Sequence, residues 1–164
     1  MSYEQVGDVN SDEKGSGARY NAGKPELDLI PLHVWIGFAR VRATPDWVIK
    51  VLSELHAWQV GAEVRAENAL VYFTPDDFEE AARVFEYGKE KYAAWNWAKG
   101  MPWSVPLGCA LRHMLPFIRN GLTPPVDSES GLSHKAHALC NLIMLAHFEK
   151  YYPEGDDRPP QECF

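Results

Sequence analysis

Apolar residues recur every three or four positions along much of the chain, and the pattern is clearest over residues 74–92. Thr74 and Pro75 open this stretch with a hydroxyl that can cap a helix and a proline suited to its first turn. The spacing predicts a helix with one apolar side that faces a core and ends in a lysine stem. The residues on that side are Phe78, Ala81, Ala82, Phe85, Lys89 and Tyr92.

Two more helices are predicted in the C-terminal half of the chain. The first spans 104–120, with Ser104 as its cap. Its apolar face consists of Leu107, Ala110, Leu111, Met114 and Ile118. The second spans about 131–151, and the polar segment 127–130 precedes it as a cap. Its middle is apolar nearly all the way round, which predicts a central position in the core.

The part of the chain before residue 74 carries weaker signals. A helix is predicted over 32–43, and after a break at 44–46 a longer apolar-periodic run reaches about Glu67. Residues 68–73 are rich in valine, tyrosine and phenylalanine, which favours a short strand. Segment 17–31 combines glycines and prolines with a few apolar anchors, so we expect an ordered loop there.

Both ends of the chain are polar. Residues 1–16 bury too little apolar surface to order themselves, and the acidic, proline-rich residues 153–164 resemble them, so two loose tails are expected. Residues 17–152 are enough for one hydrophobic core. The expected architecture is therefore mainly α, a compact helical bundle of four to five helices in a single domain.

Charge and composition narrow the class of protein. The formal net charge of −7 argues against general nucleic-acid binding, because a surface that follows phosphates needs a surplus of lysine and arginine. No window approaches the roughly 20 apolar residues that cross a bilayer, and the N-terminus is unlike a secretory signal. The three cysteines lack metal-ligand spacing and are expected to be thiols in a reducing compartment. We expect a cytoplasmic protein that binds neither nucleic acid nor membrane.

Three polar residues interrupt the apolar last helix. His134, His137 and Asn141 share one face because three and four residues separate them. A buried polar group without a partner costs about 1 to 3 kcal/mol, so these side chains must meet other polar groups, a metal ion, water or a ligand. A structural histidine with satisfied hydrogen bonds is an equally good interpretation at this stage.

Acidic residues allow two interpretations. Asp127 and Glu129 precede the last helix, where capping explains them; alternatively, one of them leans toward His113 or a divalent ion. Oxygen ligands with a few imidazoles would suit Mg²⁺ or Mn²⁺. A ridge on the 74–92 helix is either a solvated face or, if it points inward, a cation site. It consists of Glu79, Glu86 and Glu90.

The segment 91–100 places aromatic rings around an amide. Tyr92 and Trp97 could hold a purine by stacking while Asn96 reads its edge, with Lys91 close by. The same rings could equally plug the end of a helical bundle. The chain has no Walker-type phosphate loop, no G-x-S-x-G and no His-Asp dipeptide, so the hydrolases built on those motifs are disfavoured.

Four ordered blocks resemble a phage-associated family described as the N-terminal domain of dATP/dGTP diphosphohydrolases. They are GARYNAGKPELDLIP from residue 17, YGKEKYAAWNW from 87, ALRHML from 110 and DSESGLSHKAHALCN from 127, and the resemblance covers 17–31 and about 76–148. The family's recurrent positions carry over as Lys24, Asp28, Gly88, Lys91, Tyr92, Asn96, Trp97, Arg112, His113, Asp127, Glu129, His134, His137 and Asn141.

The resemblance implies a role in phage nucleotide metabolism and a distant link to MazG-like all-α pyrophosphohydrolases. Those enzymes hold Mg²⁺ with E-x-x-E and E-x-x-D motifs, whereas this chain has H-K-A-H at 134–137 and Leu122 where many relatives carry an acid. Residues 33–73 also look longer than the usual link between the first two blocks, and we interpret them as an insertion.

The first functional hypothesis is a metal-dependent purine deoxynucleotide diphosphohydrolase that releases pyrophosphate. His113, Glu129 and His137 are its candidate catalytic residues, and Mg²⁺ or Mn²⁺ is its expected ion. The candidate metal ligands are Glu86, Asp127 and His134. The candidate nucleotide-binding residues are Arg19, Lys24, Lys91, Tyr92, Asn96, Trp97, Arg112 and Asn141. The alternatives are a protein that binds or sequesters nucleotides without turnover, and a helical accessory subunit. A homo-oligomer is expected in each case.

Overall fold

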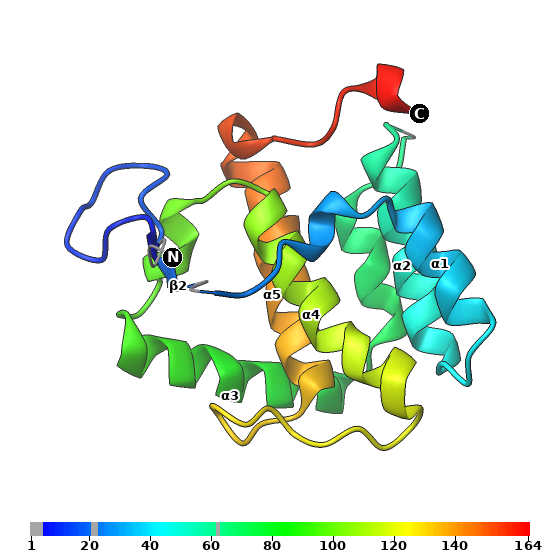
Figure 1. Cartoon of the computed structure of the whole chain (residues 1–164). Coiled ribbons are helices and arrows are strands. Elements are labelled where there is room, and N and C mark those ends of the chain that lie inside the picture. The colour runs from blue at the N-terminus through cyan, green and yellow to red at the C-terminus, as the bar shows by residue number, and fades with distance from the viewer. Residues whose placement is uncertain (1–4, 21–22, 62) are drawn as a thin grey trace.

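The computed structural model describes residues 5–20, 23–61 and 63–164, and the protein is mainly α, as the sequence predicts. Its α-helices in these ranges are α1 (Leu32–Arg40), α2 (Asp46–Gln59), α3 (Pro75–Lys91), α4 (Ser104–Asn120) and α5 (His134–Tyr151). Figure 1 shows α4 and α5 side by side at the centre, α1 and α2 on one flank, and α3 crossing near one end of the central pair. No helix in these ranges is both long and apolar enough to cross a membrane.

The central position predicted for the last helix is confirmed. Helix α5 packs against α4, against α3 and against the 3-10 helix η2 (Ala66–Tyr72). Its buried side chains surround the helix: Ala136, His137, Ala138, Leu139, Cys140, Asn141, Leu142, Met144, Leu145 and Phe148. The polar members of this set are therefore inside the protein, where they need partners.

The predicted start of α3 is confirmed, but its predicted core stripe is partly wrong. Thr74 Oγ1 accepts a hydrogen bond from Asp77 N at 3.1 Å, and Asp77 Oδ2 accepts one from Thr74 N at 2.8 Å, which is a capping box. Ala81 and Val84 are buried, whereas Phe78 is 42% exposed. Because α3 crosses the bundle at its edge, it buries a narrower stripe than its apolar spacing suggests.

Segment 60–73 is not built as the sequence predicts. The second helix ends at Gln59 instead of near Glu67, because Gly61 follows in the left-handed region with a φ of 79°. The strand expected over 68–73 is wrong, and the 3-10 helix η2 occupies that stretch. Glu149 of α5 holds its start, since Oε1 accepts a hydrogen bond from Ala66 N at 3.0 Å. Together with α1 and α2, η2 completes one side of the core.

The caps expected for the last two helices are also corrected. Ser104 is the first residue of α4, and its backbone N–H donates to Asp157 Oδ1 at 2.8 Å, so the C-terminal segment supplies the cap. Ser133 caps α5 by accepting a hydrogen bond from Ala136 N at 3.0 Å. Asp127 lies too far ahead of α5 to cap it, and its carboxylate instead closes a separate turn by accepting a hydrogen bond from Ser130 N at 2.8 Å.

The described residues at both ends of the chain contact the helices. Strand β1 (Gln5–Val6) pairs antiparallel with β2 (Arg19–Tyr20), and Gly17 N donates to Gly100 O at 2.8 Å. At the other end, the guanidinium of Arg158 lies over the rings of Trp58 and Trp103. The N-terminal contacts matter for the site because they carry Arg19 against α4 and α5.

Candidate functional site

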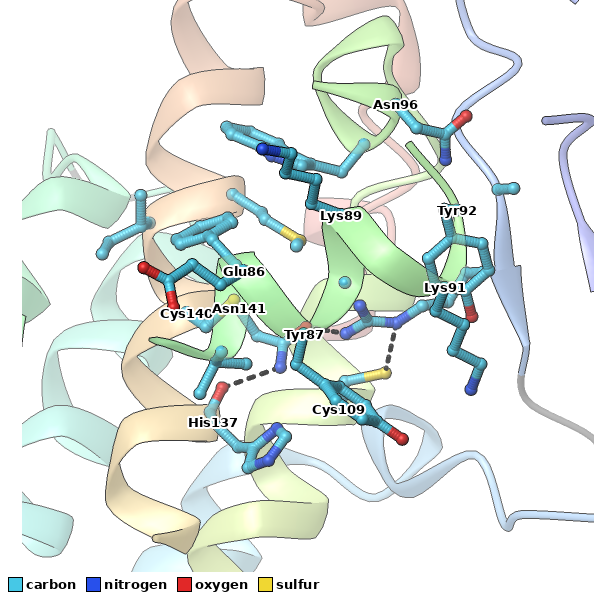
Figure 2. Close-up of a pocket in the computed structure, with 18 of the residues that line it drawn as sticks. Glu86, Tyr87, Lys89, Lys91, Tyr92, Asn96, Cys109, His137, Cys140 and Asn141 are labelled. Carbon is cyan, nitrogen blue, oxygen red and sulfur yellow. Dashed lines mark hydrogen bonds between the residues drawn. The ribbon is translucent and has the colours of Figure 1, made fainter. Parts of the chain in front are cut away.

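A cavity of about 640 Å³ opens beside the central helix pair. It lies between β2, the C-terminal half of α3, the segment after α3, the middle of α4 and α5, and the turn at 127–129 (Figure 2). Apart from His134, each residue that the sequence singled out for the site lines this cavity: Arg19, Lys24, Glu86, Lys91, Tyr92, Asn96, Trp97, Arg112, His113, Asp127, Glu129, His137 and Asn141. Residues that are far apart in the sequence therefore line the same cavity.

Arg19 reaches the wall of the cavity from β2 and organises its polar floor. Its Nη2 donates a hydrogen bond to Asn141 Oδ1, and its Nε donates to Cys109 Sγ at 3.4 Å. Asn141 Nδ2 in turn donates to His137 O at 2.8 Å. The buried amide of Asn141 is thus paired on both sides, which fixes the guanidinium of Arg19 in the interior.

Cys109 lies between two guanidinium groups, because Arg112 Nη1 also approaches its Sγ, at 3.5 Å. Burial raises the pKa of the Cys109 thiol, but the positive charges of Arg19 and Arg112 outweigh burial and hold that pKa below its ordinary value. Burial dominates at Cys140 on α5, where the pKa rises to about 12. The cavity therefore contains one thiol whose pKa is lowered and one whose pKa is raised.

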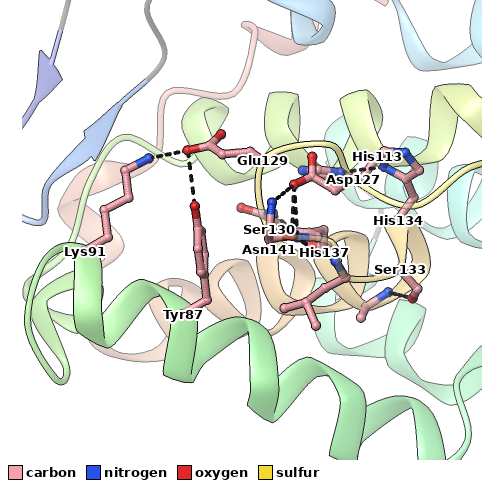
Figure 3. Close-up of polar contacts among 12 residues, drawn as sticks. Tyr87, Lys91, His113, Asp127, Glu129, Ser130, Ser133, His134, His137 and Asn141 are labelled. Carbon is pink, nitrogen blue, oxygen red and sulfur yellow. Dashed lines mark hydrogen bonds and ion pairs between the residues drawn. The ribbon is translucent and has the colours of Figure 1, made fainter.

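Three imidazoles gather at one end of the site (Figure 3). His113 Nδ1 and His134 Nδ1 lie 3.1 Å apart, and the rings of His113 and His137 stack with centroids 4.4 Å apart. Burial lowers the pKa of each of these histidines, and that of His113 falls to about 2 because His137 also lies close to it. The imidazoles are consequently neutral near pH 7.

Asp127 is the anionic member of this group. Ser130 donates to its Oδ2 twice, from the backbone N at 2.8 Å and from Oγ at 2.9 Å. Burial raises the pKa of Asp127, but these hydrogen bonds more than offset burial and hold the pKa below its usual value. Ser130 Oγ also lies 2.6 Å from His137 Nε2, so one hydroxyl joins the carboxylate to an imidazole.

A metal ion could be held at this end of the site. Donor atoms of His113, Asp127 and His134 all lie within 4.8 Å of one another. The ligand set proposed from the sequence shares Asp127 and His134 with this group, but Glu86 is exposed on α3 and lies outside it. The third member of the group is His113, which the sequence analysis proposed as a catalytic residue and not as a metal ligand.

Glu129 belongs to a separate cluster with two lysines. Its Oε1 accepts a hydrogen bond from Lys91 Nζ at 2.8 Å (Figure 3). Its Oε2 lies 3.9 Å from Lys24 Nζ. The hydrogen bond from Lys91 lowers the pKa of the Glu129 carboxyl. A carboxylate therefore occupies the space between two cations at the edge of the cavity.

The opposite end of the cavity is aromatic. The ring of Trp97 lies 5.3 Å from Phe85, 5.1 Å from His147 and 6.0 Å from Trp95 between centroids. Trp95 is 72% exposed and adopts a left-handed backbone with a φ of 62°. Asn96 is only 5% exposed, and in the part of the chain that the structure describes neither of its amide atoms has a hydrogen-bond partner.

Several residues of the site were not singled out from the sequence. Ser130 links Asp127 to His137, Cys109 joins two arginines, and Tyr87 Oη lies 3.5 Å from Glu129 Oε1. A signal for Cys109 exists in the sequence, because it precedes Arg112 by one helical turn. Ser130 was taken for part of a helix cap, and its sequence context alone favours that interpretation.

Part of the chain is similar in sequence to a known phage protein. A protein of Salmonella phage PMBT28 named dATP/dGTP diphosphohydrolase is 35% identical over 80 residues, which are 49% of this chain and 26% of that protein. The chain thus spans about a quarter of the length of this curated relative. No solved structure matches the chain.

A family model gives broader coverage than this pairwise match. The model described as dATP/dGTP diphosphohydrolase, N-terminal, matches residues 56–158, which include the site residues on α3, α4 and α5 and the turn at 127–129. The match begins inside the segment 33–73 that we interpreted as an insertion. Because the match covers more than half of the chain, this protein belongs to the dATP/dGTP diphosphohydrolase N-terminal family.

Proposed function

We propose that the chain binds a purine deoxynucleoside triphosphate in this cavity and hydrolyses it to the monophosphate and pyrophosphate with a divalent metal ion. The observation that carries the proposal is the arrangement of one cavity, aromatic at one end, cationic at its edge and lined by imidazoles and a carboxylate at the other end. Its volume of about 640 Å³ lies within the ordinary range for small-molecule sites.

The aromatic end suits the base. Trp97 and Tyr92 offer ring faces for stacking, and the buried amide of Asn96 offers a donor and an acceptor that no described residue uses. Such an amide pairs well with the N6 and N7 atoms of adenine, and the carbonyl and ring nitrogen of guanine also present a polar edge. The base would then lie away from the imidazoles.

The cationic edge suits the phosphates. Lys24 and Lys91 face the carboxylate of Glu129, and a triphosphate presents the same kind of anionic oxygen to them. Arg112 adds a guanidinium from α4. Phosphate oxygens would exchange with Glu129 at the two lysines, which leaves that carboxylate available to the reaction.

In the reaction, a water oxygen forms a bond to the α-phosphorus, and the bond from that phosphorus to the bridging oxygen of pyrophosphate breaks. A divalent ion at the His113, Asp127 and His134 end would neutralise phosphate charge and polarise water. We assign the neutral imidazole of His137, which lines the cavity, to accept the proton of the water. Ser130 positions that ring.

The test incubates the purified chain with dATP, dGTP, dCTP and dTTP in turn, with Mn²⁺, and separates products by ion-exchange chromatography. We expect monophosphate and pyrophosphate from the purine substrates, and loss of both products in His137→Ala. The exposed His33 on α1 provides the matched control, because His33→Ala removes an imidazole that does not line the cavity. Absence of product from every nucleotide would refute the enzymatic proposal.

Nucleotide binding without turnover is the second candidate. It is favoured by the length of the relative, since about three quarters of the phage protein lies outside the match and can carry the activity in its name. Thermal stabilisation by dATP or dGTP without products would support this alternative, because a ligand that binds only the native state raises its stability. Neither products nor stabilisation would leave a structural role for the polar residues.

A further inference from the structure

We infer that His113, Asp127 and His134 form a binding site for a first-row transition-metal ion, of the class of Mn²⁺, Fe²⁺, Co²⁺ or Zn²⁺, and that Mg²⁺ is a poor occupant. The two imidazoles come from α4 and α5, and the carboxylate comes from the turn between these helices (Figure 3). The inference stands on the donor atoms alone, and it gives the proposed hydrolysis its ion.

The spacing of the imidazole nitrogens matches a shared ion. Histidine nitrogens bind such metals at about 2.1 Å, so two of them on one ion lie about 3.0 Å apart at a right angle and about 3.4 Å apart in a tetrahedron. His113 Nδ1 and His134 Nδ1 are 3.1 Å apart, inside this range. The two nitrogens come from different helices, so an ion bound by both of them would link α4 to α5.

The carboxylate is oriented by neighbours that bind one of its oxygens. Both hydrogen bonds from Ser130, and the 3.7 Å contact from His137 Nε2, end on Oδ2 of Asp127. This leaves Oδ1 as the candidate ligand atom. Groups that hold a ligand in this way are a regular part of metal sites, where they fix the direction of the donor.

The donor set decides the class of ion. Mg²⁺ demands oxygen ligands in a near-ideal octahedron, and this group offers a single carboxylate. Two imidazoles and one carboxylate are the donors that iron, manganese, cobalt and zinc accept, with positions left open for water or substrate. His113 and Asp127 also line the cavity, so a ligand in the cavity can reach such an open position.

The sequence led us to expect Mg²⁺ or Mn²⁺. The donor set disfavours Mg²⁺, keeps Mn²⁺ and adds Fe²⁺, Co²⁺ and Zn²⁺ as candidate ions. A simpler state of the same residues is a direct hydrogen bond between the two Nδ1 atoms, with one protonated and one accepting. That state needs no ion. The two accounts differ in whether the nitrogens bind a metal when one is offered.

The experiment uses the whole chain, stripped of metal with a chelator and dialysed, without nucleotide. Zn²⁺, Mn²⁺ and Mg²⁺ are titrated separately by isothermal titration calorimetry, and Co²⁺ is titrated by visible absorption. We expect one ion per chain for Zn²⁺ and Co²⁺, a cobalt spectrum typical of mixed nitrogen and oxygen ligation, and no saturable binding of Mg²⁺ over the range that saturates the site with Zn²⁺.

Variants assign the signal to these residues. His134→Ala removes the least buried of the two imidazole ligands and should abolish the cobalt spectrum, while Ser130→Ala should weaken binding by about 10- to 100-fold. His147→Ala is the matched control, since His147 lines the same cavity outside the donor group. Circular dichroism confirms that each variant is folded.

Three results would overturn the inference: no binding of Zn²⁺ or Co²⁺, binding of Mg²⁺ as tight as that of Zn²⁺, or an unchanged cobalt spectrum in folded His134→Ala. Because no nucleotide is present, these results are separate from those of the hydrolysis assay. Metal binding without hydrolysis would preserve this inference and refute the enzymatic proposal. Hydrolysis without binding of Zn²⁺ or Co²⁺ would preserve the enzymatic proposal and refute this inference.

Discussion

At Cys109, burial and charge act on the thiol in opposite directions, and the two neighbouring guanidiniums prevail. The sulfur lies 3.4 Å from Arg19 Nε and 3.5 Å from Arg112 Nη1. Cys140 lines the same cavity from α5, and there burial outweighs the nearby positive charge and raises the pKa of the thiol to about 12. The two sulfurs should therefore differ in reactivity although both are buried.

We predict that a small alkylating reagent modifies Cys109 faster than Cys140 at pH 7. The reason is that the thiolate is the reacting form, and its fraction is larger at the lower pKa. Peptide mapping by mass spectrometry over time measures the two rates and separates both from the exposed Cys163. Arg112→Gln should slow the reaction at Cys109, and equal rates at the two buried cysteines would contradict the prediction.

His113 provides a second prediction, which concerns stability against pH. Its pKa falls from about 6.5 in an unfolded chain to about 2 in the fold, because burial lowers it first of all. The neighbouring His137, His134 and Arg19 lower it further, and Asp127 opposes them only in part. Between these pKa values the unfolded state binds a proton that the folded state does not, so stability decreases as pH falls below about 6.5 and is unaffected above it. His134 and His137 shift in the same direction.

Chemical denaturation between pH 5 and pH 8, in the presence of a chelator, measures this effect. The free energy of unfolding should fall toward acid by up to about 1.4 kcal/mol per pH unit for each imidazole that stays neutral. His113→Gln should reduce the slope of unfolding free energy against pH by up to about 1.4 kcal/mol per pH unit, the contribution of one imidazole. His33→Gln changes an exposed residue and should leave the slope unchanged. A slope that is the same in wild type and His113→Gln would exclude this origin.

At the scale of elements, the sequence predicted helices where local signals act alone. Thr74 and Pro75 announce α3 because a cap and a first-turn proline work within one turn of chain. The strand predicted over residues 68–73 is wrong because strand propensity has no effect without a partner strand. Glu149 of α5 instead holds the start of a 3-10 helix in this segment. That contact joins residues 83 positions apart, which no local pattern records.

The start of α5 was misplaced for a related reason. Asp127, Ser128, Ser130 and Ser133 are all of residue types that can cap a helix. Only the geometry shows that Ser133 does so, while Asp127 turns toward the histidines. We predict that Ser133→Ala lowers the free energy of unfolding by about 1 kcal/mol, because it removes the bond to Ala136 N. Urea denaturation measures the change.

Two companion variants test this assignment of the cap. Ser133→Thr retains a hydroxyl and should restore most of the stability. Ser128→Ala changes an exposed residue of the segment that the sequence favoured as a cap, and it should alter stability by less than about 0.5 kcal/mol. A larger loss in Ser128→Ala than in Ser133→Ala would show that the helix is capped elsewhere.

At the scale of the whole molecule, the residues of the site were largely predictable and their grouping was not. The sequence named Arg19, His113 and Asn141 from their chemistry and from recurring blocks. It could not show that Arg19 donates a hydrogen bond to Asn141, because the two residues are 122 positions apart and four α-helices lie between them in the chain. It also could not separate the Glu129 cluster from the Asp127 cluster. These two acids are only two positions apart in the sequence, yet Glu129 pairs with Lys91 whereas Asp127 lies beside His137.

Self-association, expected from the sequence, stays a prediction. Val34, Phe38 and Val41 lie on one side of α1 and its C-terminal cap, and they are 48%, 46% and 81% exposed. Exposed apolar side chains at this spacing are where we expect a second copy to bind. Light scattering coupled to size exclusion should give a dimer for the wild type and a monomer for Phe38→Asp. Val71→Asp, at another exposed apolar position, should remain dimeric.

The C-terminal segment ties distant helices together through Arg158. Its guanidinium carbon lies 4.9 Å from the ring centre of Trp58 on α2 and 5.3 Å from that of Trp103 before α4. Its Nη1 donates to Trp58 O at 2.9 Å, and its Nη2 lies 2.8 Å from Asp156 Oδ2. A segment that looks loose from its composition thus closes over the end of the core.

We predict that Arg158→Ala lowers the free energy of unfolding by on the order of 2 kcal/mol, through loss of cation–π contacts and a hydrogen bond to the backbone. Arg158→Lys should recover only part of this, because an ammonium cannot stack on both indoles and bond to Trp58 O at once. Lys150→Ala, which removes an exposed cation over the single ring of Tyr151, serves as the control for the loss of one cation and its contact with one ring. Since Arg158 is not among the residues that line the cavity, nucleotide and metal binding at 25 °C should survive in the folded variant. A loss of either would mean that the C-terminal segment also shapes the site.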